Sequence, residues 1–309
     1  MENRSASILD IAIEINNKNI KESGTAAQSG DRALLILGSK GAGKSTLINS
    51  LQGKNELPKP TLALEYSFLR RSGKSLVYKD VCNIWELGGG LLFSDIASVP
   101  IKYSGSLNKI AVILMLDLSN PQQLWITLEH YLMKLIKILS EYADKHGLSE
   151  EVTKNSWERL SGMHHHQDKS FIEPFPIPLL IIGGKYDVFK QFDIEDKKLI
   201  CQTLRNISHS YGATLVFYSS KDQVLLKRGK DLLTQYAFYT SISNVNKNIV
   251  QDFLKPLFIP AGADSFQQIG VSPSGSLQEE SVFTVPEDPA KDKHFEEPGL
   301  DLLISQKNN

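Results

Sequence analysis

The chain has 309 residues, 41% of them hydrophobic and 22% charged, and its formal net charge is −1. These values are typical of a soluble globular protein, and the charge balance argues against a nucleic-acid binder or a polybasic membrane protein. No apolar run approaches about 18 residues, so we expect no membrane insertion. Both cysteines, Cys82 and Cys201, lie in apolar runs and are expected to be buried, reduced thiols of a cytosolic protein.

Residues 1–30 are predicted to form an N-terminal arm. Ile8, Ile11, Ala12 and Ile15 recur at helical spacing, so a short amphipathic helix that packs on the domain is the preferred interpretation. A helix that binds a membrane or a partner protein is the alternative.

From residue 31 to residue 240, short apolar runs alternate with amphipathic stretches. Strands are predicted at 32–38, 63–70, 74–87, 109–119, 177–187 and 213–220, and helices at 45–53, 120–147, 193–212 and 222–239. The second and third strands read as a hairpin-like pair, and the unalternating run at 109–119 indicates a central strand buried on both faces. The order predicts an α/β doubly wound sheet, mostly parallel with one antiparallel edge strand and with helices on both faces.

Three regions depart from this alternation. Residues 148–170 form a polar, partly helical insertion, in which "MHHHQD" (163–168) reads as a solvated loop, because adjacent histidines do not readily face one metal ion. Residues 241–270 keep apolar anchors in "KPLFIPAGADSF", which either pack back on the domain or contact a partner chain. Residues 271–309 are rich in Pro, Ser and acidic residues and are predicted to be a disordered tail.

The stretch "GSKGAGKS" at 38–45 matches the phosphate-binding loop G-x-x-x-x-G-K-[ST], and a predicted strand precedes it and a predicted helix follows it. Its glycines allow backbone N–H groups to approach phosphate oxygens at a helix N-terminus. Lys44 would reach the β- and γ-phosphates, and Ser45 would ligate Mg²⁺. The candidate residues of this P-loop NTPase site are Gly38, Ser39, Lys40, Gly41, Ala42, Gly43, Lys44, Ser45 and Thr46.

Two later strand ends favour GTP or GDP over ATP as the ligand. In "GGKYD" (183–187), Lys185 and Asp187 fit the guanine-reading pattern [NT]-K-x-D, although Gly184 lacks the amide expected there. Ser220 and Lys221, in "SSK", resemble the S-A-K element that contacts the guanine oxygen. Ordinary strand-end turns are the alternative interpretation of both stretches, and Asp117 as the Walker B acid of an ATPase is a second one.

The residues that would hydrolyse the nucleotide are altered. Thr61 and Glu86 stand where Mg²⁺ ligands are expected, but glutamate is about 1.3 Å longer than aspartate, which would strain an octahedral shell. Gly90 stands where a side chain would orient the attacking water. We therefore predict nucleotide binding without effective hydrolysis, and no catalytic residues.

Taken together, these stretches resemble the dynein light intermediate chains, most closely their cytoplasmic dynein 2 type. The resemblance is carried from about residue 30 to residue 270 by five stretches: "PKPTLALEY" (58–66), "WELGGG" (85–90), "PFPIPLLIIGGKYDVF" (174–189), "CQTLRNISHSYGA" (201–213) and "KPLFIPAGADSFQQIG" (255–270). It implies a Ras-like domain that binds and stabilises the dynein heavy chain without being an enzyme itself.

The resemblance further implies the other dynein 2 subunits as partners, an indirect link to microtubules and to the intraflagellar-transport machinery, and a place in the cytoplasm, cytoskeleton, cilium and basal body. The dynein 1 members carry a long C-terminal extension with an effector-binding helix, whereas about 40 residues follow Gly270 in this sequence. The short apolar stretch at 299–306 is a candidate adaptor helix. Two alternatives stay open: a GTP-binding switch with slow hydrolysis, and a module that holds a nucleotide as a fixed cofactor.

Overall fold

The computed structural model describes residues 32–54, 56, 58–72, 79–160, 167–238 and 249–271. The predicted N-terminal helix, the histidines of the 163–168 run and the tail from residue 272 lie outside the described residues. In the part that is described, no helix has the length and apolar character needed to cross a membrane.

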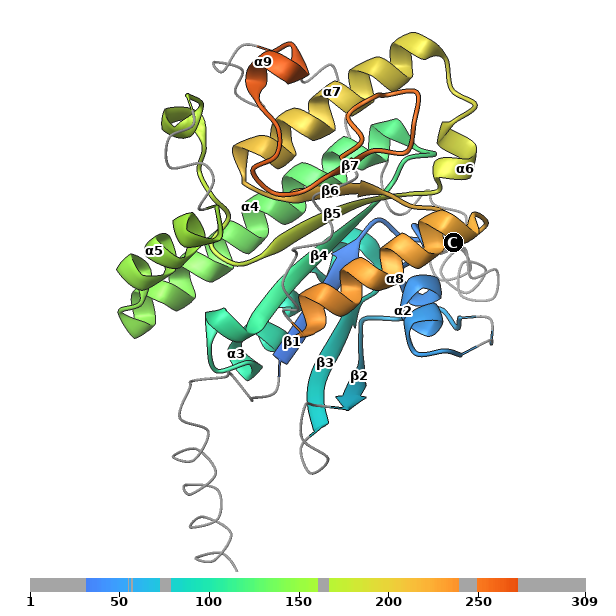
Figure 1. Ribbon diagram of the computed structural model, residues 1–309. Helices are drawn as coiled ribbons and strands as arrows, with labels where there is room; N and C mark the ends of the chain where they lie inside the picture. Colours follow the sequence, from blue (N-terminus) through green and yellow to red (C-terminus); the bar gives the residue numbers. More distant parts are fainter. Residues whose placement is uncertain are drawn as a thin grey trace, which may run out of the picture. The chain divides into compact units, whose positions relative to one another are not determined.

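Seven strands form one sheet in the order β2-β3-β1-β4-β5-β6-β7 (Figure 1). Their bounds are β1 Arg32–Gly38, β2 Leu64–Ser72, β3 Lys79–Leu87, β4 Ile110–Asp117, β5 Leu179–Gly184, β6 Thr214–Phe217 and β7 Phe258–Ile259. β3, β1, β4, β5 and β6 run parallel to one another, β2 pairs antiparallel with β3, and β7 pairs antiparallel with β6. All eight residues of β4 are buried, which confirms the predicted central strand.

The α-helices connect these strands and cover the sheet. They are α2 Lys44–Leu51, α3 Ser98–Tyr103, α4 Pro121–His146, α5 Ser149–Arg159, α6 Tyr186–Phe189, α7 Ile194–Ser210, α8 Gln223–Phe238 and α9 Phe266–Ile269, with 3-10 turns η1 Gly90–Ala97, η2 Leu107–Lys109 and η4 Lys169–Phe171. α4 shows why the longest prediction held: Asn120 caps its N-terminus, Pro121 occupies the first turn, and Gly147 ends it in a left-handed conformation.

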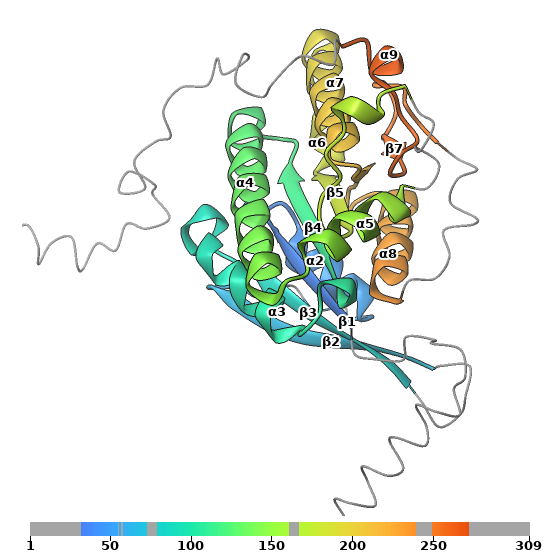
Figure 2. The same cartoon turned by 90° about the vertical axis from the view of Figure 1, so that its left-hand side faces the viewer.

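Two apolar cores lie on the two faces of the sheet. Side chains of η1, α3, α4, α6 and α7 pack on one face, and those of α2 and α8 pack on the other; Figure 2 shows α4 and α8 on opposite sides of the strands. Cys82 and Cys201 are buried free thiols, one in each core, and burial raises the pKa of each to about 12. Helices therefore cover both faces, as the doubly wound prediction required.

The sheet has a second antiparallel edge that the sequence analysis did not predict. β7 is only two residues long, and the fold continues past residue 240 to include 249–271. Arg205 of α7 makes a bidentate contact with Asp264, with Nε–Oδ2 at 2.8 Å and Nη2–Oδ1 at 2.7 Å, and both side chains are buried. Nearby, Asp168 accepts from the backbone N–H of Phe266 and lies 2.9 Å from His209 Nε2. Whether 249–271 also contacts a partner chain stays a prediction.

Candidate functional site

The loop between β1 and α2 has the backbone of an anion cradle. Gly38, Gly41 and Gly43 all have positive φ angles, of 130°, 73° and 103°, which L-residues with side chains rarely adopt. A Cβ on Gly38 would lie 1.9 Å from the carbonyl oxygen of Met115, so β1 and β4 approach too closely for any other residue. The three glycines of "GSKGAGKS" are thus favoured by their backbone conformation, and Gly38 is also required by space.

Lys44 lies inside this cradle. Its Nζ donates to the carbonyl oxygens of Ser39 at 2.9 Å and Gly38 at 3.3 Å, and the residue is 6% exposed. Burial lowers the pKa of Lys44, and the nearby Glu86 carboxylate opposes that shift. The ammonium group is therefore held at the mouth of the loop, where it is weakly hydrated and suited to pair with an anion.

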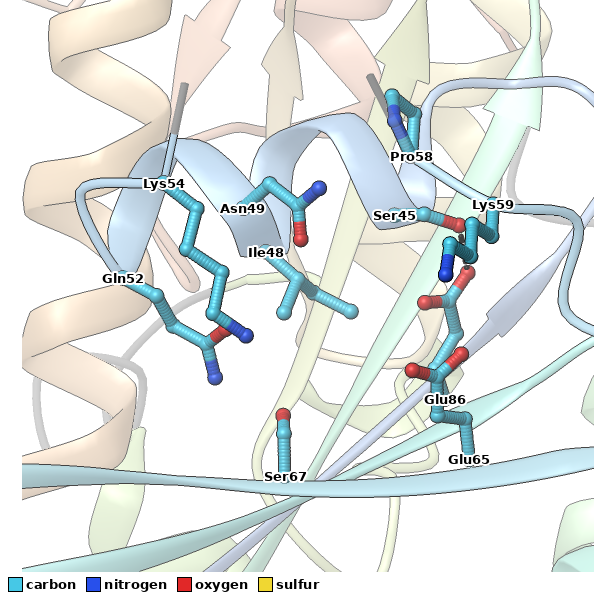
Figure 3. Close-up of a pocket in the computed structure, with 10 residues that line it drawn as sticks. All are labelled: Ser45, Ile48, Asn49, Gln52, Lys54, Pro58, Lys59, Glu65, Ser67 and Glu86. Carbon is cyan, nitrogen blue, oxygen red and sulfur yellow. Dashed lines mark hydrogen bonds between the residues drawn. The ribbon is translucent and has the colours of Figure 1, made fainter. Parts of the chain in front are cut away.

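Hydroxyl and carboxylate groups from three elements gather beside the loop (Figure 3). Ser45 Oγ donates to Glu86 Oε1 at 2.6 Å. Ser45 Oγ also lies 3.5 Å from Thr61 Oγ1. Thr61 Oγ1 in turn donates to Glu65 Oε2 at 3.2 Å. The structure therefore brings together the three predicted Mg²⁺ ligands Ser45, Thr61 and Glu86, and it adds Glu65, which the sequence analysis did not select.

Glu86 is the buried member of this group. Burial raises the pKa of Glu86, the hydrogen bond from Ser45 and the Lys44 charge oppose the rise, and the neighbouring Glu65 carboxylate adds to it. Glu65 and Glu86 face each other across the β2–β3 ladder, so two ionised carboxylates would repel each other. A cation bound between them would remove that repulsion. Their environment therefore suits a divalent cation that neutralises both.

The segment after β3 offers backbone but no side chain. A Cβ on Gly88 would lie 2.1 Å from the carbonyl oxygen of Thr61. Gly90 has φ 58°, and its carbonyl oxygen accepts from Tyr131 Oη at 2.5 Å. The nearest atom to a Cβ on Gly90 would be Lys40 Cβ, 3.9 Å away. No polar side chain is available at this position to hold a water against a terminal phosphate.

Asp117, at the end of β4, forms hydrogen bonds with Ser119 and an ion pair with Lys185. Its Oδ1 accepts from the backbone N–H and the hydroxyl of Ser119, at 2.9 and 2.6 Å, and its Oδ2 lies 2.6 Å from Lys185 Nζ. The pairing follows from the register, in which Asp117 lies opposite Gly184. These contacts give Asp117 a role in holding the Lys185 side chain and disfavour the Walker B interpretation.

The second predicted base-reading element is assembled around Asp187. Asp187 Oδ1 accepts from Ser219 Oγ at 2.7 Å, and Oδ2 pairs with Lys221 Nζ at 2.8 Å. The ion pair with Lys221 is the main cause of the lowered pKa of Asp187. Ser220 is exposed and Ser219 is buried, so the hydroxyl that holds the carboxylate comes from the first serine of "SSK".

Gly184 joins the phosphate end of the site to the base end. A Cβ there would lie 2.5 Å from the carbonyl oxygen of Ala42 in the phosphate loop. The asparagine that the guanine pattern prefers at this position therefore does not fit, and a direct backbone approach takes its place. Lys185 follows with φ 58°, the one positive value of a non-glycine residue in the described chain, and that turn directs Lys185 toward Asp117.

Most predicted site residues thus lie along the carboxyl ends of β1, β4, β5 and β6, where ligands bind in open α/β sheets. Glu65 was not predicted because only the pairing of β2 with β3 brings it next to Glu86. Ser219 was not predicted because the S-A-K pattern contacts the base through its backbone, whereas here the Ser219 hydroxyl holds Asp187. Among the described residues, no cluster of three His, Cys, Asp or Glu side chains is arranged as a metal site. A bound Mg²⁺ would therefore need hydroxyl, water or phosphate ligands in addition to carboxylates, which is the donor set that Mg²⁺ prefers.

Comparison with known proteins places this site in context. The family model for the dynein light intermediate chain (DLIC) matches residues 15–176. The chain is 37% identical to cytoplasmic dynein 2 light intermediate chain 1 of Bos taurus, over 96% of this chain and 91% of that protein. It is 40% identical to the Homo sapiens protein of the same name, over 84% and 74%.

Similarity to the other cytoplasmic dynein is weaker. Cytoplasmic dynein 1 light intermediate chain 1 of Homo sapiens is 26% identical over 77% of this chain and 51% of that protein. Among solved structures, the conserved domain of a dynein light intermediate chain superposes with a TM-score of 0.57 at 16% identity, covering 77% of this chain and 84% of that one. That likeness supports the assignment of the fold.

Proposed function

This chain belongs to the dynein light intermediate chain family, and on that premise we propose that it is a non-catalytic light intermediate chain of the cytoplasmic dynein 2 motor. The observation that carries the proposal is the similarity to the dynein 2 proteins along nearly the whole of both chains. The weaker, half-length match to the dynein 1 protein favours the dynein 2 type over its relative.

In this role the chain binds and stabilises the dynein 2 heavy chain alongside the other dynein 2 subunits. It acts in retrograde intraflagellar transport and cilium assembly, in the cytoplasm, the cytoskeleton, the cilium and the basal body. Motor ATP hydrolysis belongs to the heavy chain, and contact with microtubules is indirect.

The phosphate loop supports a second part of the proposal: the domain holds GTP or GDP with Mg²⁺. Lys44 and the backbone of 38–46 would hold the phosphates, and Ser45 with Thr61, Glu86 and Glu65 would surround the cation. Lys185, Asp187, Ser220 and Lys221 would contact the base, with Ser219 holding Asp187 in place. The bound nucleotide supplies negative charge that Lys44 neutralises, and it stabilises the folded domain by mass action.

Slow or absent hydrolysis follows from the segment after β3. Gly90 has no side chain to orient water, and Glu86 already bonds to Ser45. Orienting groups of this kind contribute orders of magnitude to nucleotide hydrolysis. The alternative function, a GTP-binding switch that hydrolyses slowly, is favoured by the assembled Asp187–Ser219–Lys221 element, which is the arrangement expected of a working base site.

Co-expression with the tail of a dynein 2 heavy chain tests the first part. We expect the two chains to co-purify at a fixed ratio and the tail to become more soluble. A dynein 1 heavy-chain tail is the matched control and should be retained less. A chain that elutes alone under both conditions would exclude the heavy-chain role.

Chromatography of the nucleotide released by denaturing the purified chain tests the second part. We expect a guanine nucleotide, and single-turnover hydrolysis of labelled GTP at the background rate. Turnover that depends on Lys44 would instead establish the switch, whereas a preparation with no nucleotide would leave the loop a structural element.

A further inference from the structure

The outer edge of β2 is the longest unpaired strand edge in the described part of the chain. β2 has nine residues, LEYSFLRRS, with no proline or glycine, and the strand order ends at it. Its side chains Tyr66 and Phe68 are 50% and 45% exposed. Long edge strands tend to pair with another chain unless they are covered, interrupted or protected by charged side chains. The charged residues of β2 are Glu65, Arg70 and Arg71, so a strand that pairs with this edge must carry charges that complement them.

The backbone of β2 alternates between two directions. The carbonyl oxygen of Ala63 accepts from Gly88 N at 2.7 Å, so the odd-numbered residues of β2 direct their N–H and C=O groups toward β3. The even-numbered residues direct theirs outward. Consistently, the carbonyl oxygen of Phe68 is reached by Gln52 Nε2, at 3.5 Å, and not by β3.

We propose that this edge is the interface between two copies of the chain, joined by antiparallel pairing of β2 with the partner's β2 about a two-fold axis at Phe68. This arrangement places Phe68 opposite the partner's Phe68, with the N–H and C=O groups of each directed at the other. The partner's N–H would then take the place of Gln52 Nε2, which lies 3.5 Å from the Phe68 carbonyl oxygen in the single chain. The two seven-stranded sheets then form one continuous sheet. The inference rests on β2 and is independent of the proposed heavy-chain role, but it shares Glu65 with the proposed Mg²⁺ site.

Charge complementarity selects the second copy and the register. With the axis at Phe68, Glu65 lies opposite the partner's Arg71 and Tyr66 opposite the partner's Arg70, each twice by symmetry. Opposite charges and aromatic pairs at directly opposed positions stabilise antiparallel ladders. With the axis at Ser67, Glu65 opposes a leucine, and with the axis at Leu69, Phe68 opposes Arg70; neither register pairs a carboxylate with an arginine.

The contacts that these side chains already make are compatible with the pairing. Arg71 lies 3.0 Å from Asp80 of β3, and a guanidinium has five donors, enough for two carboxylates. Arg70 stacks over the Phe68 ring at 4.9 Å, so the cation is held on the aromatic face that meets the partner. The net charge of −1 leaves little repulsion between two copies.

The size of the contact sets its strength. A ladder of at most nine residues per chain buries less than a standard protein interface, so we expect a Kd of about 10–100 µM. Such a dimer forms when two copies are held near each other, for example on one assembly, where the effective concentration is high.

Sedimentation velocity of the full chain from about 1 to about 100 µM tests the dimer. We expect the weight-average mass to rise toward two chains across this range. Phe68→Pro removes an outward N–H that β3 does not use, so it should leave the monomer folded and abolish the rise. Val224→Ser, which alters an exposed apolar side chain on α8, should behave as the unaltered chain. A chain that stays monomeric throughout would overturn the proposal and leave the edge to a strand of another protein.

Cysteine cross-linking tests the register separately. Opposed residues of a hydrogen-bonded antiparallel pair have Cα atoms about 5.5 Å apart, which suits a disulfide, and the native Cys82 and Cys201 are buried. Phe68→Cys should cross-link to itself under mild oxidation. Tyr66→Cys and Arg70→Cys should not do so alone but should cross-link when mixed. Equal cross-linking of all three alone, or of none, would overturn the pairing, with circular dichroism used to verify that each variant is folded.

Discussion

The phosphate loop and the segment after β3 are neighbours in space, yet they differ in what they retain. The loop keeps every feature of an anion site: three glycines with positive φ, a buried lysine and a helix N-terminus. The segment 88–90 keeps the backbone approach to Thr61 but has no side chain that acts on water. The contrast separates the residues that would hold a nucleotide from those that would hydrolyse it, and the proposed function predicts the first activity without the second.

Gly38→Ala alters the phosphate loop and should have the largest effect on stability of the variants considered. The new Cβ would meet the carbonyl oxygen of Met115 at 1.9 Å, so β1 and β4 must separate. We expect a loss of about 3 kcal/mol or more in the free energy of unfolding, measured by chemical denaturation. Gly41→Ala has open space around its Cβ and should lose only about 1 kcal/mol, from its positive φ alone. Equal losses in the two variants would contradict the close approach.

Lys44→Ala removes the charge from the cradle without altering its backbone. Charge-assisted contacts to phosphate contribute about 1.5–3 kcal/mol, so nucleotide affinity should fall about 100-fold. Fluorescent GDP titrated into the protein measures this loss. Lys227→Ala, on the exposed face of α8, is the control and should bind as before.

Asp187→Ala addresses the base end and should act on selectivity. Loss of the carboxylate leaves the phosphate contacts intact but removes the acceptor for the guanine N–H groups. We expect the preference for GDP over ADP to fall about 10- to 100-fold, measured by competition between the two. An unchanged preference would show that the strand ends at 183–187 and 219–221 are ordinary turns.

Glu86→Gln tests the end of β3, directly before the segment 88–90. The folded-state pKa of Glu86 is raised above its ordinary value of 4.5, so its contribution to stability is fully present below that value and is lost as the pH rises through the folded-state pKa. The amide stays uncharged, so the variant should be about 1 kcal/mol more stable than the parent at neutral pH and no different in acid. Thermal unfolding across the acid range measures the difference, and Glu141→Gln, which alters an exposed carboxyl on α4, is the control.

Gly90→Gln should have the smallest effect. It supplies a polar side chain at the missing position, but Gly90 adopts φ 58° and its carbonyl is held by Tyr131. The left-handed backbone costs a side chain about 1 kcal/mol, and Glu86 is unaltered. Single-turnover GTP hydrolysis should stay within about 3-fold of the parent, about 0.6 kcal/mol in the barrier. A rise of about 100-fold would mean that this one side chain was all that hydrolysis lacked.

The sequence predicted the doubly wound sheet because its evidence is local. The apolar run 109–119 indicates a buried strand by its own composition. Asn120 and Gly147 mark the two ends of the helix that lies between them. β7 escaped prediction because two residues have no periodicity. β7 pairs with β6, and the segment that follows it is held by the ion pair between Arg205 and Asp264, which only the tertiary fold brings together.

The candidate site divides in the same way. The phosphate loop is contiguous, so its residues and their geometry were predictable from spacing. Glu65 joins Glu86 through the register of a hairpin whose turn sets the alignment, and Asp117 meets Lys185 because two parallel strands end at the same level. The need for glycine at position 184 could not be predicted either, because the atom that excludes a side chain there is the carbonyl oxygen of Ala42, which is distant in the sequence.

The bidentate pair between Arg205 and Asp264 also affects how the chain folds as it is synthesised. The carboxylate leaves the ribosome 59 residues after the guanidinium. Until it arrives, α7 cannot dock without burying an unpaired cation, at a cost of about 3–5 kcal/mol. At about 5–20 residues per second the wait lasts roughly 3–12 s. If α7 waits for Asp264, the apolar surface beneath it would stay exposed during that interval. We then expect a nascent chain stalled before residue 264 to be captured by chaperones, and one stalled well after it to escape them.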